Sequence, residues 1–495
     1  MKQNFNILHR YGFLMLMVLF FLPLIFLNVL DSHDWGGDFA MYIMEARNIL
    51  NGDPVSQTKY IYNPDNPVLG PPSYPVGFPL LLVPVMAIFG QDTYVLTTFM
   101  SFLLIVFLIA ALYFYRNYFS NLITFFLLLL IAYNPWMLMF KMEVMSDIPF
   151  AALLLILIIV ANRTAVASWK MIVVMGILAG FLISIRVIGW VFPISYLILM
   201  IVIVARSWRN ESSKRWVYFL KGIALMVISY CIYYILNHLI FRIATLEDSV
   251  YTNIWGTESL GTTILENLGY YIGVIEHFFN PQNGKWRFAS MLLRSFAVVF
   301  IFLGFFNRML RKVTIVEVLF FVYMGTLLIY PYRHSGFRFL LPVLPLLLYF
   351  FVYGLQSFKL ELKLSYKYRK YKYILLGLLL LLIYSHNTQN VCHPIEHILP
   401  GPDKPAAVEC FNYIRNNTPE NSAIAFFKPR VLALYTDRQS IANHKSQDIS
   451  SMNKRFENAG IDYLLVHKRY SDMAIREYIQ SKNDLFLKDW ENEGF

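Results

Sequence analysis

The chain consists mainly of apolar runs that are long enough to cross a lipid bilayer. Hydrophobic residues make up 57% of its 495 residues and charged residues only 15%, whereas soluble domains usually carry about 25% charged residues. A helix needs about 20 consecutive apolar residues to span the bilayer core. The sequence therefore predicts an α-helical polytopic membrane protein.

About eleven runs are predicted to be transmembrane helices. Bulky and acidic residues follow the first run instead of a small-residue cleavage site, so we expect a retained helix and not a removed signal peptide. A shorter run, 80–89, is interrupted by Pro84 and is expected to lie in the membrane interface. The predicted spans are 11–30, 94–115, 122–140, 148–161, 171–185, 187–204, 217–241, 291–306, 313–330, 339–353 and 373–384.

Lys and Arg are concentrated in alternate links between the predicted spans, and cytoplasmic loops carry an excess of these residues. This bias predicts a cytoplasmic N-terminus, with the loops 31–78 and 242–290 and everything after 384 outside the cytoplasm. It also accounts for the net charge of +11, so no nucleic acid partner is expected. A bacterial cytoplasmic membrane is the expected location, since no eukaryotic retention signal is found.

Two domains are predicted. Residues 1–390 would form a multi-span catalytic domain whose first outer loop is 31–78, and residues 403–495 a small soluble α/β domain. The second domain contains no phosphate-binding glycine loop, zinc-ligand spacing or nucleophile motif, so we expect a lid or an acceptor-docking module. A disulfide between Cys392 and Cys410 is left open. The predicted strands of this domain are 422–427 and 461–467, and its predicted helices are 406–416 and 471–481.

Asp38 is the first candidate for a catalytic residue. It ends the polar segment that follows the first apolar run, and apolar residues recur at helical spacing after it. Asp38 is therefore expected at the N-terminus of an amphipathic helix, where free backbone amides and the helix dipole favour a carboxylate. A simple helix cap is the competing interpretation of this residue.

Further polar residues lie at the same predicted membrane face. Ionisable groups next to apolar spans are costly, so they are candidates for function. Each also has a simpler interpretation: Asp147 as a helix cap, Arg186 as an anchor that reaches the interface, and the remaining charged groups as loop residues. The candidates are Tyr74, Glu143, Asp147, Arg186, Arg333, His334 and Arg338.

Acids from two loops and guanidinium groups from two others would converge if the spans form a bundle. A carboxylate can act as a general base, and Arg or a divalent cation can hold and neutralise a phosphate. These are the groups needed to handle a membrane-embedded phosphate ester. A divalent metal ion, with Asp38 and Asp147 as its ligands, is left open as a cofactor.

The order of these motifs resembles the membrane-embedded C-type glycosyltransferases, the GT-C superfamily. This superfamily includes the protein O-mannosyltransferases and the bacterial enzyme that transfers aminoarabinose to lipid A. The matching segments are Trp35–Asp38, the Tyr-Pro-rich stretch Pro71–Pro79, the acidic motif Ser146–Pro149 and the step Arg338–Pro342 into a span. Together with the order of the spans and the outer C-terminal domain, the resemblance covers most of the chain.

The resemblance implies a polyprenyl-phosphate-linked sugar as donor, transfer at the outer membrane face and inversion at the anomeric carbon. It carries the catalytic base onto Asp38 and the second acid onto Asp147, and in this hypothesis Arg338 or Arg186 binds the leaving phosphate. Asp38 is followed by Phe39, where protein mannosyltransferases usually show an Asp-Glu pair, and the Glu-Lys-Pro-Pro run of the aminoarabinose enzymes is absent. The acceptor is therefore left open as a glycan, lipid or protein.

Two alternatives are kept. A lipid or glycolipid transporter or flippase without covalent chemistry would be expected to show internal repeats and charged residues near span centres. The sequence shows no repeat, and its candidate charges gather at one predicted face. The second alternative is an inactive relative whose outer domain is a binding module.

Overall fold

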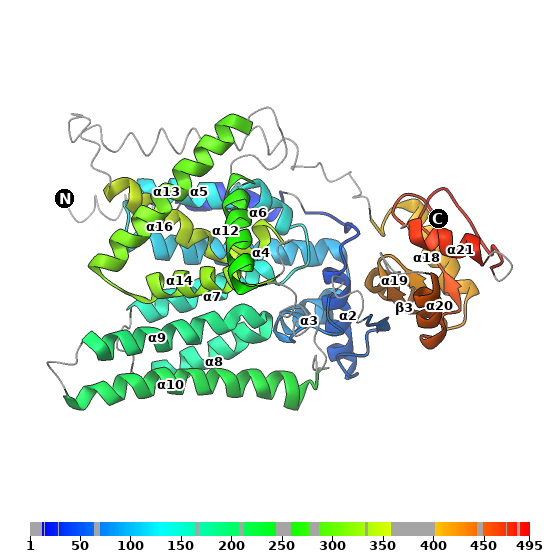
Figure 1. Ribbon diagram of the computed structural model, residues 1–495, viewed down its shortest axis with the longest axis horizontal. Coiled ribbons are helices and arrows are strands. Elements are labelled where there is room, and N and C mark those ends of the chain that lie inside the picture. The colour runs from blue at the N-terminus through cyan, green and yellow to red at the C-terminus, as the bar shows by residue number, and fades with distance from the viewer. Residues whose placement is uncertain are drawn as a thin grey trace.

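The computed structural model has two main parts that are joined by the first loop of the chain. The long helices form a bundle at one end, and the C-terminal elements lie at the other end, with α2 and α3 between them (Figure 1). We call residues 93–357 the helix bundle and residues 401–495 the C-terminal unit. The structure describes residues 12–13, 15–27, 29–63, 70–163, 168–206, 212–243, 259–277, 287–331, 335–357, 401–442, 449–471, 473–482 and 486–495.

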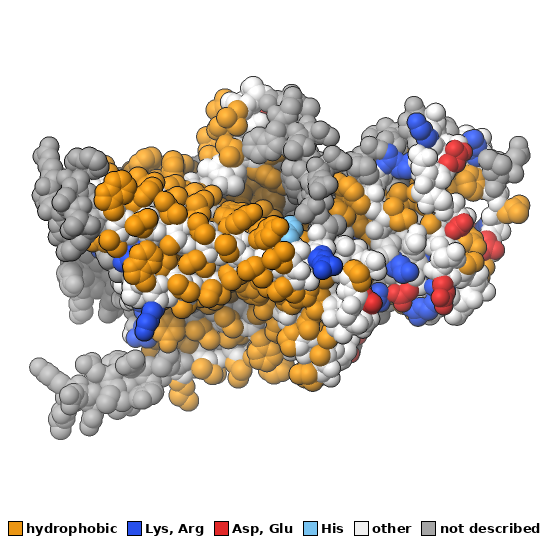
Figure 2. Space-filling view, turned by 90° about the horizontal axis from the view of Figure 1, so that it is seen from below, with side chains coloured by type: hydrophobic (Ala, Val, Ile, Leu, Met, Phe, Trp, Pro, Cys, Tyr) orange, Lys and Arg blue, Asp and Glu red, His pale blue; other side chains and the backbone are white. Residues whose placement is uncertain are grey.

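The helix bundle contains the helices that are apolar enough to cross a membrane. Among the described residues, 5 helices are long enough to do so. Hydrophobic side chains cover this end of the molecule, whereas charged side chains gather over the C-terminal unit (Figure 2). The bundle thus has the surface of a polytopic membrane protein. The long apolar helices are Thr93–Arg116, Val187–Arg206, Trp216–Ile240, Met291–Arg311 and Phe337–Ser357.

Most of the predicted spans correspond to helices of the bundle. The predicted span 373–384 lies outside the described residues. The bundle elements are α4 (Thr93–Arg116), α5 (Asn121–Ala132), α6 (Pro135–Phe140), α7 (Asp147–Arg163), α8 (Trp169–Ile185), η3 (Val187–Trp190), α9 (Val191–Arg206), α10 (Ser212–Tyr234), η4 (Ile235–Ile240), α12 (Leu260–His277), α13 (Arg287–Arg311), α14 (Ile315–Ile329), α15 (Phe337–Leu340), η6 (Leu341–Val343) and α16 (Leu344–Ser357).

Some predicted spans are interrupted where the chain contains proline. The run 122–140 forms α5 and α6 instead of one helix, because Asn134 caps α6 by accepting a hydrogen bond from Trp136 N at 2.9 Å and Pro135 is its first residue. The α-helix of the first run gives way to the 3₁₀ turn η1 (Leu22–Ile25), which contains Pro23. Proline lacks the N–H group that an uninterrupted α-helix would use at these positions.

The segment 242–290, predicted to be an outer loop between two spans, contains the helix α12, which was not predicted. One side of α12 is polar and buried: Asn267 Nδ2 donates to the carbonyl oxygens of Leu328 and Tyr330 at 2.8 and 2.7 Å. On the other side, Leu265 is 70% exposed. The helix runs across the long bundle helices (Figure 1). A helix with one polar side does not produce the continuous apolar run from which a span is predicted.

The first loop folds into three elements, α2 (Asp38–Asn51), the short strand β1 (Tyr60–Ile61) and α3 (Gly77–Phe89). The predicted amphipathic helix after Asp38 is α2, and the predicted interfacial segment 80–89 belongs to α3. Helix α2 packs against α3 on one side and against α19 of the C-terminal unit on the other. It is therefore buried between the two parts of the molecule.

The C-terminal unit contains a parallel sheet with the strand order β1-β3-β2-β4. One of its strands, β1, comes from the first loop, with Tyr60 opposite Ser440 and Ile61 opposite Ile441. Strand β2 matches the predicted strand 422–427, whereas α19, β3 and α20 were not predicted. The elements are α18 (Pro405–Asn417), β2 (Ala423–Phe426), α19 (Pro429–Thr436), β3 (Gln439–Ala442), α20 (Ile449–Asn458), β4 (Tyr463–Leu464) and α21 (Met473–Ser481).

The crossing of α13 and α16 depends on two glycines. A Cβ atom at Gly304 would overlap the carbonyl oxygen of Phe350, and one at Gly354 would overlap that of Phe300. Close backbone approach at small residues is the usual basis of helix packing in membranes. We expect Gly304→Ala to destabilise the detergent-solubilised protein by about 1–3 kcal/mol, because the helices must separate. Thermal unfolding would measure this loss.

Gly325 of α14 is the matched control, since a Cβ atom there would meet nothing within 4 Å. Gly325→Ala should leave the unfolding midpoint unchanged or raise it slightly, because Ala favours a helix over Gly. Equal midpoints for the two variants would contradict this account of the crossing.

Candidate active site

Two carboxylates stand at the first residues of two helices, Asp38 in α2 and Asp147 in α7. The N-cap of α2 is Gly37, and no side chain caps this helix end. The oxygen atoms of Asp38 instead accept hydrogen bonds from Tyr74 and Arg338. The interpretation of Asp38 as a helix cap is therefore wrong, and its carboxylate belongs to a network between elements.

Arg338 of α15 joins the two carboxylates. Its Nη1 donates to Asp38 Oδ2 at 2.8 Å, and its Nε lies 2.9 Å from Asp147 Oδ2 and 3.1 Å from Asp147 Oδ1. Helix α15 starts after Gly336, whose φ of 50° is a conformation that glycine adopts at little cost. The amide of Gly336 donates to the Tyr270 hydroxyl of α12 at 2.8 Å. Helix α12 thus supports the turn that carries Arg338.

Arg186 lies at the break between α8 and η3, where its backbone is extended. Its Nη1 donates to Asp147 Oδ1, so Asp147 is paired with two arginines. The side chain of Arg186 is 17% exposed and that of Asp147 only 1%. A purely interfacial anchor would be surrounded by water and headgroups, so the simpler interpretation of Arg186 does not fit its position.

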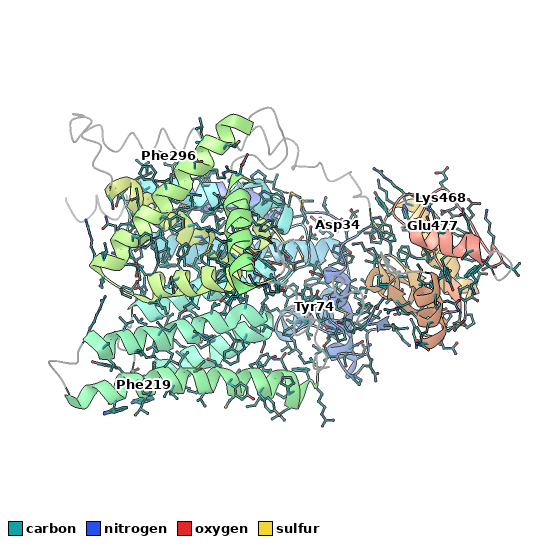
Figure 3. The ribbon with its side chains drawn as sticks, viewed as in Figure 1. Asp34, Tyr74, Phe219, Phe296, Lys468 and Glu477 are labelled. Atoms are coloured by element: carbon teal, nitrogen blue, oxygen red, sulfur yellow. The ribbon has the colours of Figure 1, made fainter. Side chains whose placement is uncertain are left out.

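Tyr74 precedes α3 and contacts Asp38 directly. Its hydroxyl donates to Asp38 Oδ1 at 2.7 Å, and its backbone N–H donates to Glu45 Oε1 at 2.7 Å. The ring stacks on Tyr42, with the centroids 4.7 Å apart. Burial raises the pKa of Tyr74 well above its usual value, so the hydroxyl keeps its proton. Tyr74 lies between the bundle and the C-terminal unit (Figure 3).

A third partner of Asp38, Arg430, comes from the C-terminal unit and was not predicted. It is the second residue of α19, and its side chain is 2% exposed. Its Nη1 lies 3.0 Å from the Tyr74 hydroxyl oxygen and 3.5 Å from Asp38 Oδ1. The Pro429-Arg430 pair could have indicated an arginine at a helix start. Because it lies far from any predicted span, its position did not suggest that burial of this charge is costly.

The side chain of Asp38 is 27% exposed, in contrast to the buried Asp147. Burial alone would raise the pKa of Asp38, but Arg338 and Arg430 lower it to about 2. Asp38 is therefore a carboxylate at neutral pH, and it is the site acid that a second molecule can reach.

Two glutamates border the cluster and prefer to be neutral. Burial raises the pKa of Glu45 well above its usual value. Burial, followed by the negative charge of Asp34, raises the pKa of Glu143 to about 8. Glu143 lies in the turn between α6 and α7, and Asp34 lies at the junction with the C-terminal unit (Figure 3). Neither glutamate is expected to cancel an arginine charge at pH 7.

Arg333 and His334 lie outside the described residues, so their roles stay predictions. In the described part of the chain, no group of three or more His, Cys, Asp or Glu side chains could hold a metal ion. Asp38 and Asp147 are each paired with arginine, so this donor set does not fit a divalent cation.

Glu143 should make the stability of the protein depend on pH. Its pKa of about 8 in the folded state exceeds the usual value of 4.5, so the folded state prefers the protonated form. The resulting stability is fully present below pH 4.5 and is lost as the pH rises through 8. We expect the unfolding midpoint of the wild type to fall between pH 5 and 9 by more than that of Glu143→Gln, whose side chain stays neutral. Parallel curves would contradict this assignment.

Searches against known proteins identified similarity at the level of structure alone. No family model and no curated protein matches the chain. ArnT from Cupriavidus metallidurans bound to undecaprenyl phosphate aligns with 91% of this chain and 90% of its own, with a TM-score of 0.55 and 13% identity. The same protein in the apo state aligns with 91% of this chain and 89% of its own, with a TM-score of 0.54 and 14% identity.

The structural alignments show a shared fold, and the sequence identities are too low to show more than that. A fold alone does not define an activity. The chain therefore has the fold of ArnT over most of its length.

Proposed function

We propose that the chain is a glycosyltransferase that moves a sugar from a polyprenyl-phosphate-linked donor to a glycan, lipid or protein of the cell envelope. The charge of the cluster carries this proposal. Three arginines are joined to only two carboxylates, and the neighbouring glutamates prefer to be neutral. The remaining single positive charge matches the single negative charge of a phosphodiester.

The similar structure of ArnT was determined with undecaprenyl phosphate bound. That protein shares the fold over most of both chains, so a polyprenyl phosphate is the donor lipid that we favour for this chain as well. The membrane lipids around the bundle would accommodate its isoprenoid tail.

Asp38 is the base in this proposal because it is the reachable acid of the cluster. Its carboxylate removes the proton from an acceptor hydroxyl or amine, and the acceptor atom forms a bond to the anomeric carbon. The bond from that carbon to the phosphate oxygen breaks, and its electron pair leaves with the polyprenyl phosphate. Attack from the face opposite the phosphate inverts the configuration, through a transition state of oxocarbenium character.

Arg338 has to release Asp38 before this step. A carboxylate whose pKa is about 2 is a weak base, and an effective base has a pKa nearer the working pH. A bound phosphate competes for Arg338, and transfer of Arg338 from Asp38 to the phosphate raises the pKa of Asp38. The donor would then both engage the arginine and activate the base.

Asp147 acts indirectly in this scheme. It is buried and holds Arg186 and Arg338, so we propose that it keeps both guanidinium groups aimed at the donor phosphate. Such fixed charges stabilise the negative charge that develops on the leaving group without reorganising during the reaction. Arg186 and Arg338 are then the phosphate ligands, and Glu143 and Tyr74 border the sugar and acceptor.

We further propose that residues 1–390 are the membrane-embedded catalytic domain and residues 403–495 a domain outside the cytoplasm. The expected location is a bacterial cytoplasmic membrane, with the N-terminus on the cytoplasmic side. The distribution of Lys and Arg over the links supports this orientation.

The test is the consumption of polyprenyl-phosphate sugars by the purified protein in nanodiscs, with a panel of cell-envelope acceptors. We expect Asp38→Asn to slow donor consumption by about 100- to 10,000-fold, because the base is lost. Binding of undecaprenyl phosphate should persist in this variant. The control is Asp31→Asn, which changes an exposed acid of the same loop and should react like the wild type.

Full activity in Asp38→Asn would remove this residue from the reaction. A wild-type protein that moves the lipid across vesicle membranes without consuming any donor would favour the transporter alternative.

A further inference from the structure

Arg430 occupies a site that is built around its guanidinium group. The group lies over the rings of Tyr60 and Tyr74, 4.9 and 5.1 Å from their centroids, and its Nη2 donates to the carbonyl oxygen of Pro71 at 2.5 Å. A Cβ atom at Gly70 would lie 2.6 Å from Nη2. Glycine is therefore needed where the first loop passes this side chain.

Burial of this charge is costly unless it is compensated. A guanidinium group that is removed from water loses much of its hydration free energy, which only close partners recover. The partners of Arg430 come from the first loop: the carbonyl of Pro71, the rings of Tyr60 and Tyr74, and the carboxylate of Asp38. When the C-terminal unit docks on the first loop, Arg430 therefore comes into contact with Asp38, the proposed base.

The two oxygen atoms of Asp38 have different partners. Oδ1 accepts a hydrogen bond from the Tyr74 hydroxyl at 2.7 Å and lies 3.5 Å from Arg430 Nη1, which also donates to Tyr74. Oδ2 accepts from Arg338 Nη1 at 2.8 Å. The Oδ1 partners belong to the first loop and the C-terminal unit, whereas the Oδ2 partner belongs to the bundle.

We propose that Arg430 is a positioning residue for the base, an inference that rests on the proposed function. Together with Tyr74, Arg430 holds Oδ1 and so fixes the orientation of the carboxylate. Oδ2 becomes the atom that accepts the proton of the acceptor when Arg338 moves to the donor phosphate. The C-terminal unit is then a part of the active site, and its docking determines whether Asp38 is aimed at the acceptor.

The proton balance of this step involves only groups already described. The acceptor O–H or N–H bond breaks and its proton passes to Asp38 Oδ2, while the electron pair of that bond forms the new bond to the anomeric carbon. The phosphate leaves with the electron pair of the broken glycosyl bond. Arg430 neither gives nor takes a proton.

Removal of Arg430 should change how Asp38 titrates. The charged and titratable groups that face Asp38 are Arg338 of α15, Arg430 of α19, Tyr74 before α3, Tyr42 of α2, and Glu143 between α6 and α7. Arg430 is one of the two groups of this set that favour the carboxylate by their positive charge. Its loss raises the pKa of Asp38, since a nearby cation stabilises the charged form.

The experiment compares Arg430→Gln, Arg430→Lys and a docking control. The control is Asp437→Asn: Asp437 pairs with Arg47 of α2 at 2.9 Å, so it links the same two helices without touching Asp38. Its φ is 54°, a conformation that Asn also tolerates. Dependence of kcat on pH and the donor KM are measured for each variant.

For Arg430→Gln we expect kcat to fall about 10- to 100-fold, because a hydrogen bond to a charged group is lost. The acidic limb of the kcat profile should move up by about one pH unit, and the donor KM should stay unchanged. Arg430→Lys keeps the charge, so it should return the limb towards its wild-type position while part of the loss in kcat remains. Asp437→Asn should leave kcat, its acidic limb and the donor KM unchanged.

The proposal would be overturned if the acidic limb of the kcat profile did not move in Arg430→Gln. It would also be overturned if Asp437→Asn lost as much kcat as Arg430→Gln. In either case Arg430 would have only a docking role. A donor KM that rises while the limb stays in place would also overturn it, because Arg430 would then bind the phosphate.

A titration that needs no activity separates this proposal from the proposed function. The carboxyl band of Asp38 is followed by infrared difference spectroscopy against Asp38→Asn, with and without Arg430. A higher pKa of Asp38 in Arg430→Gln supports the positioning role even if the wild type consumes no donor, a result that would contradict the transferase. An unchanged pKa overturns the positioning role, whatever the activity.

Discussion

Arg338 lies between Asp38 and Asp147, and this shared arginine holds the proposed active site together. Its Nη1 pairs with Asp38 Oδ2 and its Nε with both oxygens of Asp147. Carboxylates at buried or partly buried positions are costly without such a partner. The starts of α2 and α7 are therefore tied to α15, although they are far apart in the sequence.

The rest of the architecture serves this junction. Arg186 reaches Asp147 from the break between α8 and η3, and α12 supports the turn before Arg338 through Tyr270. On the opposite side, β1 adds the first loop to the sheet of the C-terminal unit, and Arg430 reaches Asp38. Arginines from the bundle and from the C-terminal unit thus meet at one carboxylate, where a change in one pairing alters the basicity of that group.

Much of the site could be predicted from the sequence because membrane boundaries make charge conspicuous. Asp38, Asp147, Arg186 and Arg338 each adjoin an apolar run, where an ionisable group is costly. The structure joins these four side chains and Tyr74 in one network.

Other features leave no such mark in the sequence. Arg430 lies outside the predicted spans, where its position alone does not make a charge costly, and its burial depends on docking between segments far apart in the chain. Strand β1 has only two residues, too few for a period to be recognised. Helix α12 has a polar side that interrupts the apolar pattern, so it was predicted as a loop. In all three cases tertiary contacts, and not local sequence, determine the structure.

The central claim is that Arg338 exchanges Asp38 for the donor phosphate. The most direct measurement is a cryo-electron microscopy structure of the protein in nanodiscs with undecaprenyl phosphate bound. The account predicts the phosphate within hydrogen-bond distance of Arg338 and Arg186, with Asp38 Oδ2 released and Oδ1 still held by Tyr74 and Arg430. A phosphate bound elsewhere, with the pair between Arg338 and Asp38 intact, would contradict it.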